Sequence, residues 1–455
     1  MEKYTPKTKQ ELEELLKDSK INLGNIDTSL ITDMSKLFYK SFRQDFSGIE
    51  SWDTSNVTTM EKMFYGATFF NHPINSWNVS KVKDMNSMFY KAMRFNQPLD
   101  KWDTSKVTDM SYMFCLAKVF NQNIDSWNVE NVIKMTGMFS EAYVFNQPLN
   151  SWNIKNAESI AGMFYDAKAF NQPLDKWDTK NITAMDSVFS SAESFNQNIN
   201  SWNTSKVASM RGMFCNAKAF NQPLNSWDTS NLKHIFSMFS GAIAFNQPLD
   251  SWKFSKVKNM SNLFYGAKSF NQNISSWDMS NITTTDRMFC GAKAFNQPLD
   301  SWDMSSIKDM YGMFMGAKAF NQLLKNWNVS NVETMTAMFC KAESFNKPLN
   351  SWDMSNVKYM GNMFQDATAF NQPLDSWNLS SVVMMTAMFN GANSFKQDIG
   401  CWKISENVYV SSMFSKNQAC PILEDSIKKW SLNKRYHKGI FENLLDSSVY
   451  DMYYS

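Results

Sequence analysis

The sequence predicts an α/β repeat solenoid, and three observations lead to this fold class. Fifteen of the 16 tryptophans, from Trp52 to Trp402, follow one another at intervals of 25 residues. Two phenylalanine columns keep the same interval, 12 and 18 residues after each tryptophan, and methionine recurs 8 and 11 residues after it. Recurrence at a fixed period of this length is the signature of stacked repeats that bury a shared core. Below, +n denotes the position n residues after the tryptophan of a repeat.

Each repeat is expected to contain one short helix and one short parallel strand. Apolar residues at +8, +11, +12 and +15, as in the stretch from Met110 to Ala117, have the spacing of one helix face. The segment from Leu99 through Trp102 to Thr104 resembles a strand that points its apolar side chains one way. Strands stack more closely than helices, so the strand side is expected to be concave.

The bend between helix and strand is expected at +19, where asparagine recurs, for example at Asn96 and Asn121. Asparagine oxygens and amides can bond backbone groups, so a column of stacked asparagines can satisfy the polar groups of such a bend.

The two ends depart from the repeat and are expected to act as caps. Thr8 and Glu11 have the capping-box spacing and open an amphipathic helix. Ile26 begins a degenerate repeat, whereas Pro421 begins a non-repeat helical tail. The predicted organisation is therefore an N-terminal helical cap (1–24), a degenerate first repeat (25–51), a solenoid of about 15 repeats (52–417) and a C-terminal helical cap (418–455).

Composition argues against several classes of protein. The 45 basic and 43 acidic residues give a net charge of only +2, which disfavours a nucleic-acid-binding protein. A content of 43% hydrophobic residues disfavours a disordered chain. No apolar run is long enough to cross a bilayer, and the first residues, Met1 to Pro6, do not resemble a secretory leader. We expect a protein without membrane insertion, whose compartment the sequence leaves open.

The sequence also argues against an enzyme. His72, His234 and His437 are 162 and 203 residues apart in the sequence, and no metal, nucleotide or cofactor motif occurs. Four cysteines share the +13 column but lie at least two coils apart, too far for a disulfide; they are Cys115, Cys215, Cys290 and Cys340. Cys401 and Cys420 near the C-terminal end could meet. No catalytic residue, metal ligand or cofactor is expected.

The outward side of the predicted strands is the candidate binding surface, because aspartate or asparagine follows most of the tryptophans. The acidic members of this +1 column are Asp53, Asp103, Asp178, Asp228, Asp278, Asp303 and Asp353. They form either a solvated surface, in which asparagine dilutes like-charge repulsion, or a mildly acidic strip for a basic or polar partner. A calcium ladder is a third interpretation, although the glycine-rich turns of calcium-binding β-rolls are missing.

The aromatic columns could be a carbohydrate platform, but their phase assigns them to the core. The residues expected to represent this core are Trp52, Phe64, Phe70, Trp102, Phe114, Phe120, Trp202, Phe214 and Phe220.

The repeated unit, in which Phe-Asn-Gln-Pro-Leu-Asp-Ser-Trp precedes Asp-Thr-Ser-Asn-Val-Thr and a Met-Phe pair, resembles the BspA-like leucine-rich-repeat proteins of bacteria. The resemblance extends from Tyr4 to about residue 417. It implies a right-handed, leucine-rich-repeat-like coil and a cell-surface or secreted protein that binds host, matrix or microbial proteins.

Two functions are compatible with this sequence. The first is a non-enzymatic protein-interaction scaffold, adhesin-like, that binds an unknown protein through the concave strand face. The second is a structural or antigen-varying repeat spacer without a dedicated ligand.

Overall fold

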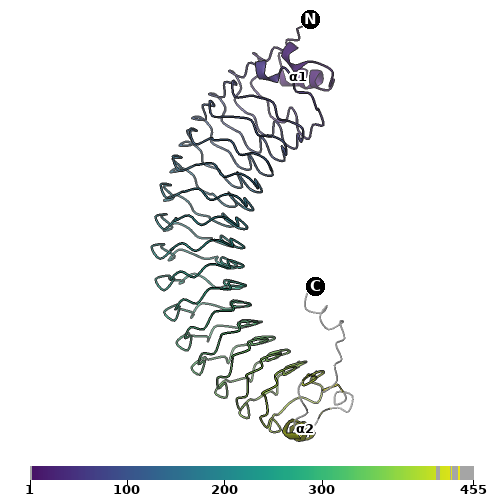
Figure 1. Cartoon of the computed structure of the whole chain (residues 1–455), viewed down its shortest axis with the longest axis vertical. Helices are drawn as coiled ribbons and strands as arrows, with labels where there is room; N and C mark the ends of the chain where they lie inside the picture. Colours follow the sequence, from purple (N-terminus) through teal and green to yellow (C-terminus); the bar gives the residue numbers. More distant parts are fainter. Residues whose placement is uncertain (1–2, 417–420, 431, 433–438, 441–455) are drawn as a thin grey trace. The chain divides into compact units, whose positions relative to one another are not determined.

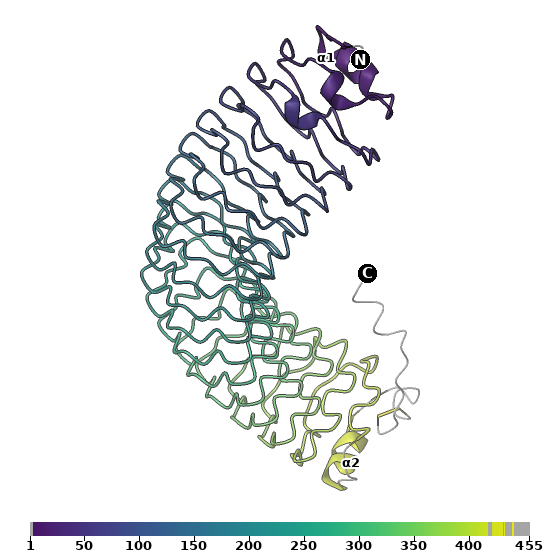
Figure 2. The same cartoon turned by 45° about the horizontal axis from the view of Figure 1, so that its top comes forward.

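The computed structural model describes residues 3–416, 421–430, 432 and 439–440. The chain divides into two compact units, unit 1 from Met1 to Leu232 and unit 2 from Lys233 to Ser455. Each unit is a stack of similar coils (Figures 1 and 2), which confirms the predicted repeat solenoid. The named helices lie at the ends: α1 (Lys9–Leu16), η1 (Leu23–Asn25) and η2 (Ile49–Ser51) in unit 1, and α2 (Pro421–Lys428) in unit 2.

The predicted strand at the tryptophan is wrong. In the described coils the β-structure consists of isolated parallel bridges at +7, and the tryptophan lies between turns. In unit 1 the bridges join successive coils from Asp33 to Ser209, and in unit 2 from Asn259 to Tyr409. The segment before each tryptophan contains an apolar residue that suits a strand, such as Leu99, but this buried residue is followed directly by a turn.

The predicted helix from +8 to +15 is also wrong, because consecutive turns replace it in the described coils. Lys62 at +10 and Gly66 at +14 have φ of 55° and 70°, which interrupts a right-handed helix. The N–H groups of Lys62 and Phe64 donate to carbonyls of the next coil at 2.8 and 2.9 Å. The N–H of Met63 instead donates to the Met60 carbonyl within the coil, at 3.1 Å. Backbone donors therefore alternate between the local turn and the neighbouring coil.

The coils of unit 1 are closer together on this turn side than at the tryptophans. The rings of Tyr65 and Tyr90, both at +13, lie 4.4 Å apart, whereas those of Trp52 and Trp77 lie 6.4 Å apart. The expectation that the tryptophan side is concave is therefore wrong for this unit.

Aromatic columns form the core of both units. The nine core residues named above are each no more than 4% exposed. Within one coil the +12 and +18 rings stack closely, as in the 3.9 Å pair Phe114–Phe120. Each indole N–H reaches back to a carbonyl of the preceding coil, for example from Trp102 to Ile74 at 3.0 Å. Burial and this hydrogen bond together fix the register between coils.

The asparagines at +19 form the expected ladder. The Oδ1 of Asn71 accepts the backbone N–H of Asn96 at 2.9 Å, and the Oδ1 of Asn96 accepts that of Asn121 at the same distance. The glutamine at +20 adds a second donor, since Gln97 Nε2 lies 3.2 Å from the Asn71 carbonyl oxygen. One asparagine per coil thus satisfies polar groups of the next coil.

The helix α1 lies at the N-terminal end of unit 1. Thr8 caps this helix, because its side chain accepts the N–H of Glu11 at 3.2 Å. The carboxylate of Glu11 accepts the N–H of Lys7, one residue before the position of a capping box. A parallel bridge between Tyr4 and Ile26 joins this end to the degenerate first repeat.

At the C-terminal end the aromatic column continues into the tail. Trp430 stacks on Trp402 at 5.8 Å, and its indole N–H donates to the Ile399 carbonyl at 3.0 Å. Asp398 accepts hydrogen bonds from Ser426 of α2 at 2.6 Å and from Lys429, just after α2, at 3.1 Å, and these bonds attach this segment to the last coil. The suggested pair of Cys401 and Cys420 lies outside the described residues, because Cys420 is one of those not described. The boundaries 24/25 and 417/418 stay predictions.

Candidate functional site

Within each unit, the exposed side chains at +1, +4 and +6 of successive coils form a surface, which we call the polar face. It is polar because the side chains between them, at +2 and +5, point inward, as Thr104 and Val107 do. At +6 the backbone joins neighbouring coils, since the N–H of Ile133 donates to the Thr108 carbonyl at 2.9 Å. Side chains at equal positions are therefore held in register from coil to coil.

The seven predicted aspartates lie on the polar face, in turns rather than in a strand. In each, Oδ1 accepts the backbone N–H two residues later, at 2.9 Å for Asp53 and 3.2 Å for Asp178. Asn128 and Asn203 hold the same turn with their amide oxygens at 3.0 Å. Either side chain supplies the required acceptor, which explains the alternation of aspartate and asparagine in this column.

These hydrogen bonds stabilise the ionised carboxylates. The side-chain and backbone groups of Ser55 hold the pKa of Asp53 below its usual value, and Ser305 does the same for the pKa of Asp303. Asp278 and Asp303 lie on adjacent coils, and Asp53 follows Asp27 of the degenerate first repeat, whereas the other four have Asn or Lys253 in the neighbouring repeats. The column is therefore a row of separate charges, not a continuous acidic strip.

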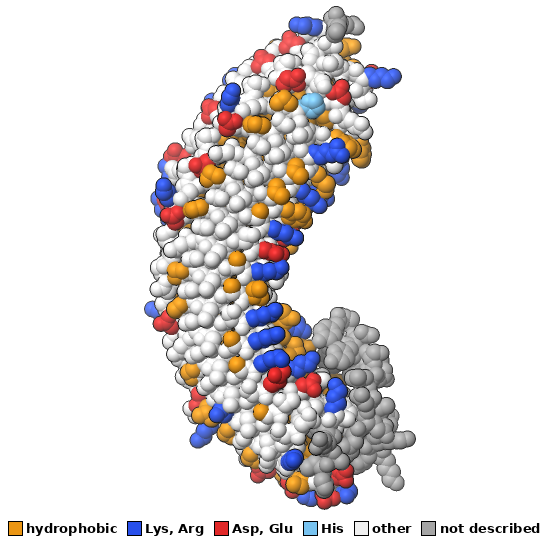
Figure 3. Space-filling view, viewed as in Figure 1, with side chains coloured by type: hydrophobic (Ala, Val, Ile, Leu, Met, Phe, Trp, Pro, Cys, Tyr) orange, Lys and Arg blue, Asp and Glu red, His pale blue; other side chains and the backbone are white. Residues whose placement is uncertain are grey.

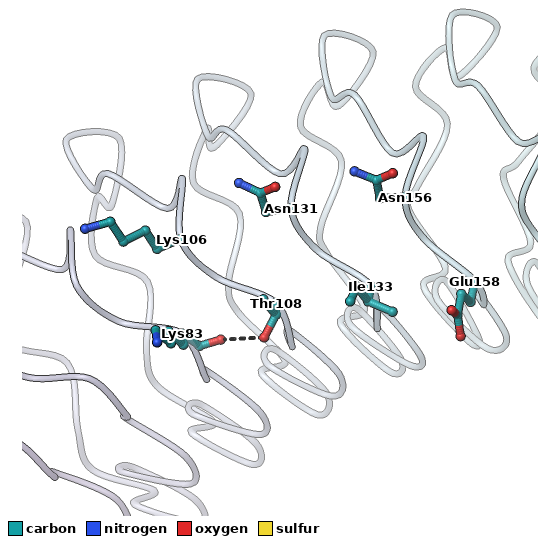
Figure 4. A pocket seen from close by; sticks show the side chains of 7 residues that line it. All are labelled: Lys83, Lys106, Thr108, Asn131, Ile133, Asn156 and Glu158. Atoms are coloured by element: carbon teal, nitrogen blue, oxygen red, sulfur yellow. Dashed lines mark hydrogen bonds between the residues drawn. The ribbon is translucent and has the colours of Figure 1, made fainter.

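A hollow in the polar face of unit 1 was not predicted from the sequence. It has a volume of about 600 Å³ and spans four coils. Figure 4 shows its lining side chains, which come from +4 and +6: Lys83, Lys106, Thr108, Asn131, Ile133, Asn156 and Glu158. The signal that could have indicated it is isoleucine at a +6 position, where most coils carry a polar residue.

The hollow combines three kinds of chemistry. Ile133 is 40% exposed and lies between basic and acidic groups, with Lys83 and Lys106 in earlier coils and Glu158 in the next (Figure 4). Asn131 uses its amide to donate to the Ser105 carbonyl at 2.8 Å, which holds this side chain against the preceding coil. A fixed apolar side chain flanked by opposite charges suits recognition of a protein segment.

The described residues contain no group of three or more His, Cys, Asp and Glu side chains that could hold a metal ion. The pKa of the Cys115 thiol is raised to about 11, and that of Cys340 to about 12, in both cases chiefly by burial. Protonated thiols of this kind are poor nucleophiles. Throughout the described part of the chain, no helix has both the length and the apolar character required to cross a membrane.

Asp286, at +9 in unit 2, offers a test of the electrostatics. Burial raises its pKa to about 6; Arg287 opposes the rise and Asp309 adds to it. Its Oδ1 has no hydrogen-bond partner among the described residues. The folded state therefore holds this proton more tightly than an unfolded chain does, and ionisation between about pH 4 and pH 6 destabilises the fold.

We expect Asp286→Asn to stabilise the protein at pH 7 by about 1 kcal/mol, since a partly exposed charge is screened by water. The gain should disappear below about pH 4, where the carboxyl is neutral in both states. Thermal unfolding at both pH values measures it. Asp303→Asn is the control, because its carboxylate is stabilised by hydrogen bonds and its loss should not raise the melting temperature at pH 7. A gain for Asp286→Asn that is the same at both pH values would contradict the assignment.

Comparison with known proteins gives one family and a set of distant structures. The family model described as "Mycoplasma protein of unknown function, DUF285" matches six overlapping segments: 10–114, 93–201, 171–277, 248–352, 287–389 and 344–446. No curated protein gives a significant match.

Among solved structures, an internalin of Listeria monocytogenes is 8% identical over 93% of this chain and 92% of its own, with a TM-score of 0.22. A leucine-rich repeat protein of Bacteroides ovatus is 12% identical over 76% and 88%, with a TM-score of 0.30. A leucine-rich repeat protein of Leptospira interrogans is 7% identical over 95% and 99%, with a TM-score of 0.19.

Proposed function

The chain belongs to the family described as Mycoplasma proteins of unknown function, DUF285, and that description gives no function. From the surface of the chain itself, we propose that it is a non-enzymatic protein-interaction scaffold that binds through the polar face. The observation that supports this most strongly is the hollow around Ile133, an exposed apolar side chain on a mostly polar surface. Exposed apolar groups ringed by polar ones are typical of protein interfaces.

The partner that this hollow suits is a protein segment with one apolar anchor between charged groups. An acidic group of the partner would meet Lys83 and Lys106, and a basic group would meet Glu158. The aspartates at +1 extend the same face, so a long partner could contact several coils. An adhesin-like role at the cell surface or after secretion, which the BspA-like resemblance implies, belongs to this proposal.

The proposal can be tested by placing a photo-crosslinking amino acid at position 133 of the full chain in its native cell. A second variant carries it at Val119, which is 43% exposed and lies outside the polar face. We expect a discrete protein adduct from position 133 that Lys106→Glu abolishes, and none from position 119. Equal adducts from both positions, or none from position 133, would refute binding at the hollow. Charge reversal at Asp178, Asp228 and Asp278 then tests whether the +1 column contributes.

A repeat spacer without a ligand is the second candidate function, and one observation favours it. Many side chains of the polar face already hold the coils together: Asn156 binds the Glu130 carbonyl at 2.8 Å and Thr183 binds the Glu158 carbonyl at 3.3 Å. Deleting the single 25-residue repeat 177–201 distinguishes the two functions. A spacer should keep its role with one coil less, whereas a scaffold that contacts several coils should lose affinity.

A further inference from the structure

A second surface carries lysine on three successive coils of unit 2. Lys268, Lys293 and Lys318 all occupy +16 and are exposed. Their coils are joined at this position, since the N–H of Ala294 donates to the Lys268 carbonyl and that of Ala319 to the Lys293 carbonyl, both at 3.2 Å. Figure 3 shows basic side chains following one another from coil to coil in this way. We call these three residues the lysine row.

The lysine row is only partly neutralised. Lys318 pairs with Glu343 at 2.7 Å. Lys268 and Lys293 have no ion pair and no aromatic ring beneath the ammonium group in the part of unit 2 that the structure describes. Like charges directly opposite one another on neighbouring chain segments destabilise the fold. A row of this kind therefore has an electrostatic cost that an anionic partner would relieve.

The same column in unit 1 shows which partners such lysines otherwise have. Lys118 and Lys168 belong to the repeats before and after that of Tyr143. Their ammonium nitrogens lie 5.3 and 5.0 Å from the centre of the Tyr143 ring. Lys218 pairs with Glu193 at 3.0 Å. Both units contain three lysines at +16, but those of unit 1 are separated by partners within the column, which makes them a matched control.

Beside the lysine row lies a strip of backbone without side chains, which we call the glycine floor. Position +14 is glycine in four successive coils, at Gly241, Gly266, Gly291 and Gly316. All four have φ between 64° and 69°. Other coils place larger residues in the same conformation, such as Asn216 with φ of 56° and Asp166 with φ of 53°. The backbone therefore does not require glycine here, and a Cβ added at Gly266, Gly291 or Gly316 would meet only the backbone of the preceding glycine.

We propose that the lysine row and its glycine floor bind an extended acidic segment of another protein, independently of the polar face. The coils repeat at 5.6–5.7 Å, measured between the rings of Phe264, Phe289 and Phe314. Alternate residues of an extended segment lie about 6.6–6.8 Å apart, a difference that flexible lysine side chains accommodate. Acidic residues at every second position would then meet one ammonium group each. A single-stranded nucleic acid fits less well, because bases need aromatic platforms and Tyr265 is the one aromatic residue at +13 to +17 of these coils.

The experiment measures fluorescence anisotropy of a labelled peptide of alternating Glu and Ser, with the full-length chain as the binder. Replacing Lys268, Lys293 and Lys318 together by Gln is expected to weaken binding by about tenfold or more. The same replacement of Lys118, Lys168 and Lys218 removes equal charge and should weaken it by less than about twofold. Gly291→Asn introduces the residue that the chain already has in this conformation at Asn216. It should weaken binding, because its side chain would occupy space on the glycine floor. Unchanged melting temperatures show that the variants are folded.

Three outcomes would overturn the proposal. Equal losses from the two triple variants would show a general charge effect. Failure of the wild-type chain to bind the peptide at low salt would remove the site. Tighter binding of an oligothymidylate of equal charge would assign the row to nucleic acid instead.

Discussion

Replacing Trp302 with alanine is expected to lower the free energy of unfolding by about 3–5 kcal/mol. The indole is 2% exposed and stacks on Trp277 at 6.4 Å. Its N–H donates to the buried Ile274 carbonyl at 3.1 Å, which the substitution would leave without this donor. The cavity and the lost hydrogen bond act together, so this variant should have the largest effect on stability of those considered.

Urea denaturation and hydrogen exchange would measure this loss. Since a repeat contacts mainly its neighbours, exchange should accelerate most in the coils that begin at Trp277, Trp302 and Trp327. Ser301→Ala, next to it in sequence but exposed, is the control and should cost less than about 0.5 kcal/mol. If the two variants unfold alike, the tryptophan column does not hold the coils together.

Removing one asparagine of the +19 ladder should have the second largest effect. The Oδ1 of Asn296 accepts the backbone N–H of Asn321 at 2.9 Å and the Nε2 of Gln322 at 2.9 Å. Asn296→Ala deprives both donors of that oxygen, and an unpaired, partly buried donor costs about 1–3 kcal/mol.

Asn296→Asp is the informative companion, because a carboxylate presents the same acceptor in the same place. It should retain most of the stability that alanine loses, by the same urea titration. A loss as large as that of alanine would mean that the ladder depends on the amide group rather than on its oxygen.

The sequence predicted the columns but not the backbone between them. Apolar residues at +8, +11, +12 and +15 suit a helix face, yet consecutive turns bring the same positions inward. Glycine at +10 or +14 would have signalled such turns, as at Gly66, but residues such as Lys62 and Leu116 occupy them in the same left-handed conformation. Only the neighbouring coil, which accepts every second N–H, makes these turns more stable than a helix.

The binding surfaces were predictable to different degrees. The aspartates at +1 could be found by spacing, but their role in holding turns, as for Asp53 and Ser55, depends on backbone geometry. Ile133 is one of a few apolar residues in a mostly polar column, and its meaning depends on the side chains of three neighbouring coils. The lysine row is visible in the sequence as equal spacings, whereas the fact that Lys268 and Lys293 have no ion pair among the described residues is not.

By itself, the sequence determined that coils of 25 residues stack and that tryptophan, phenylalanine and asparagine columns lie in contact with their copies, because the period does not vary from Trp52 to Trp402. The tertiary structure decided where the backbone pairs, which side of unit 1 is closely spaced and which charges are neutralised. The physical reason is that burial follows from the pattern of side chains, whereas hydrogen bonds and ion pairs depend on which donors, acceptors and charges the adjacent coil has at the equivalent position.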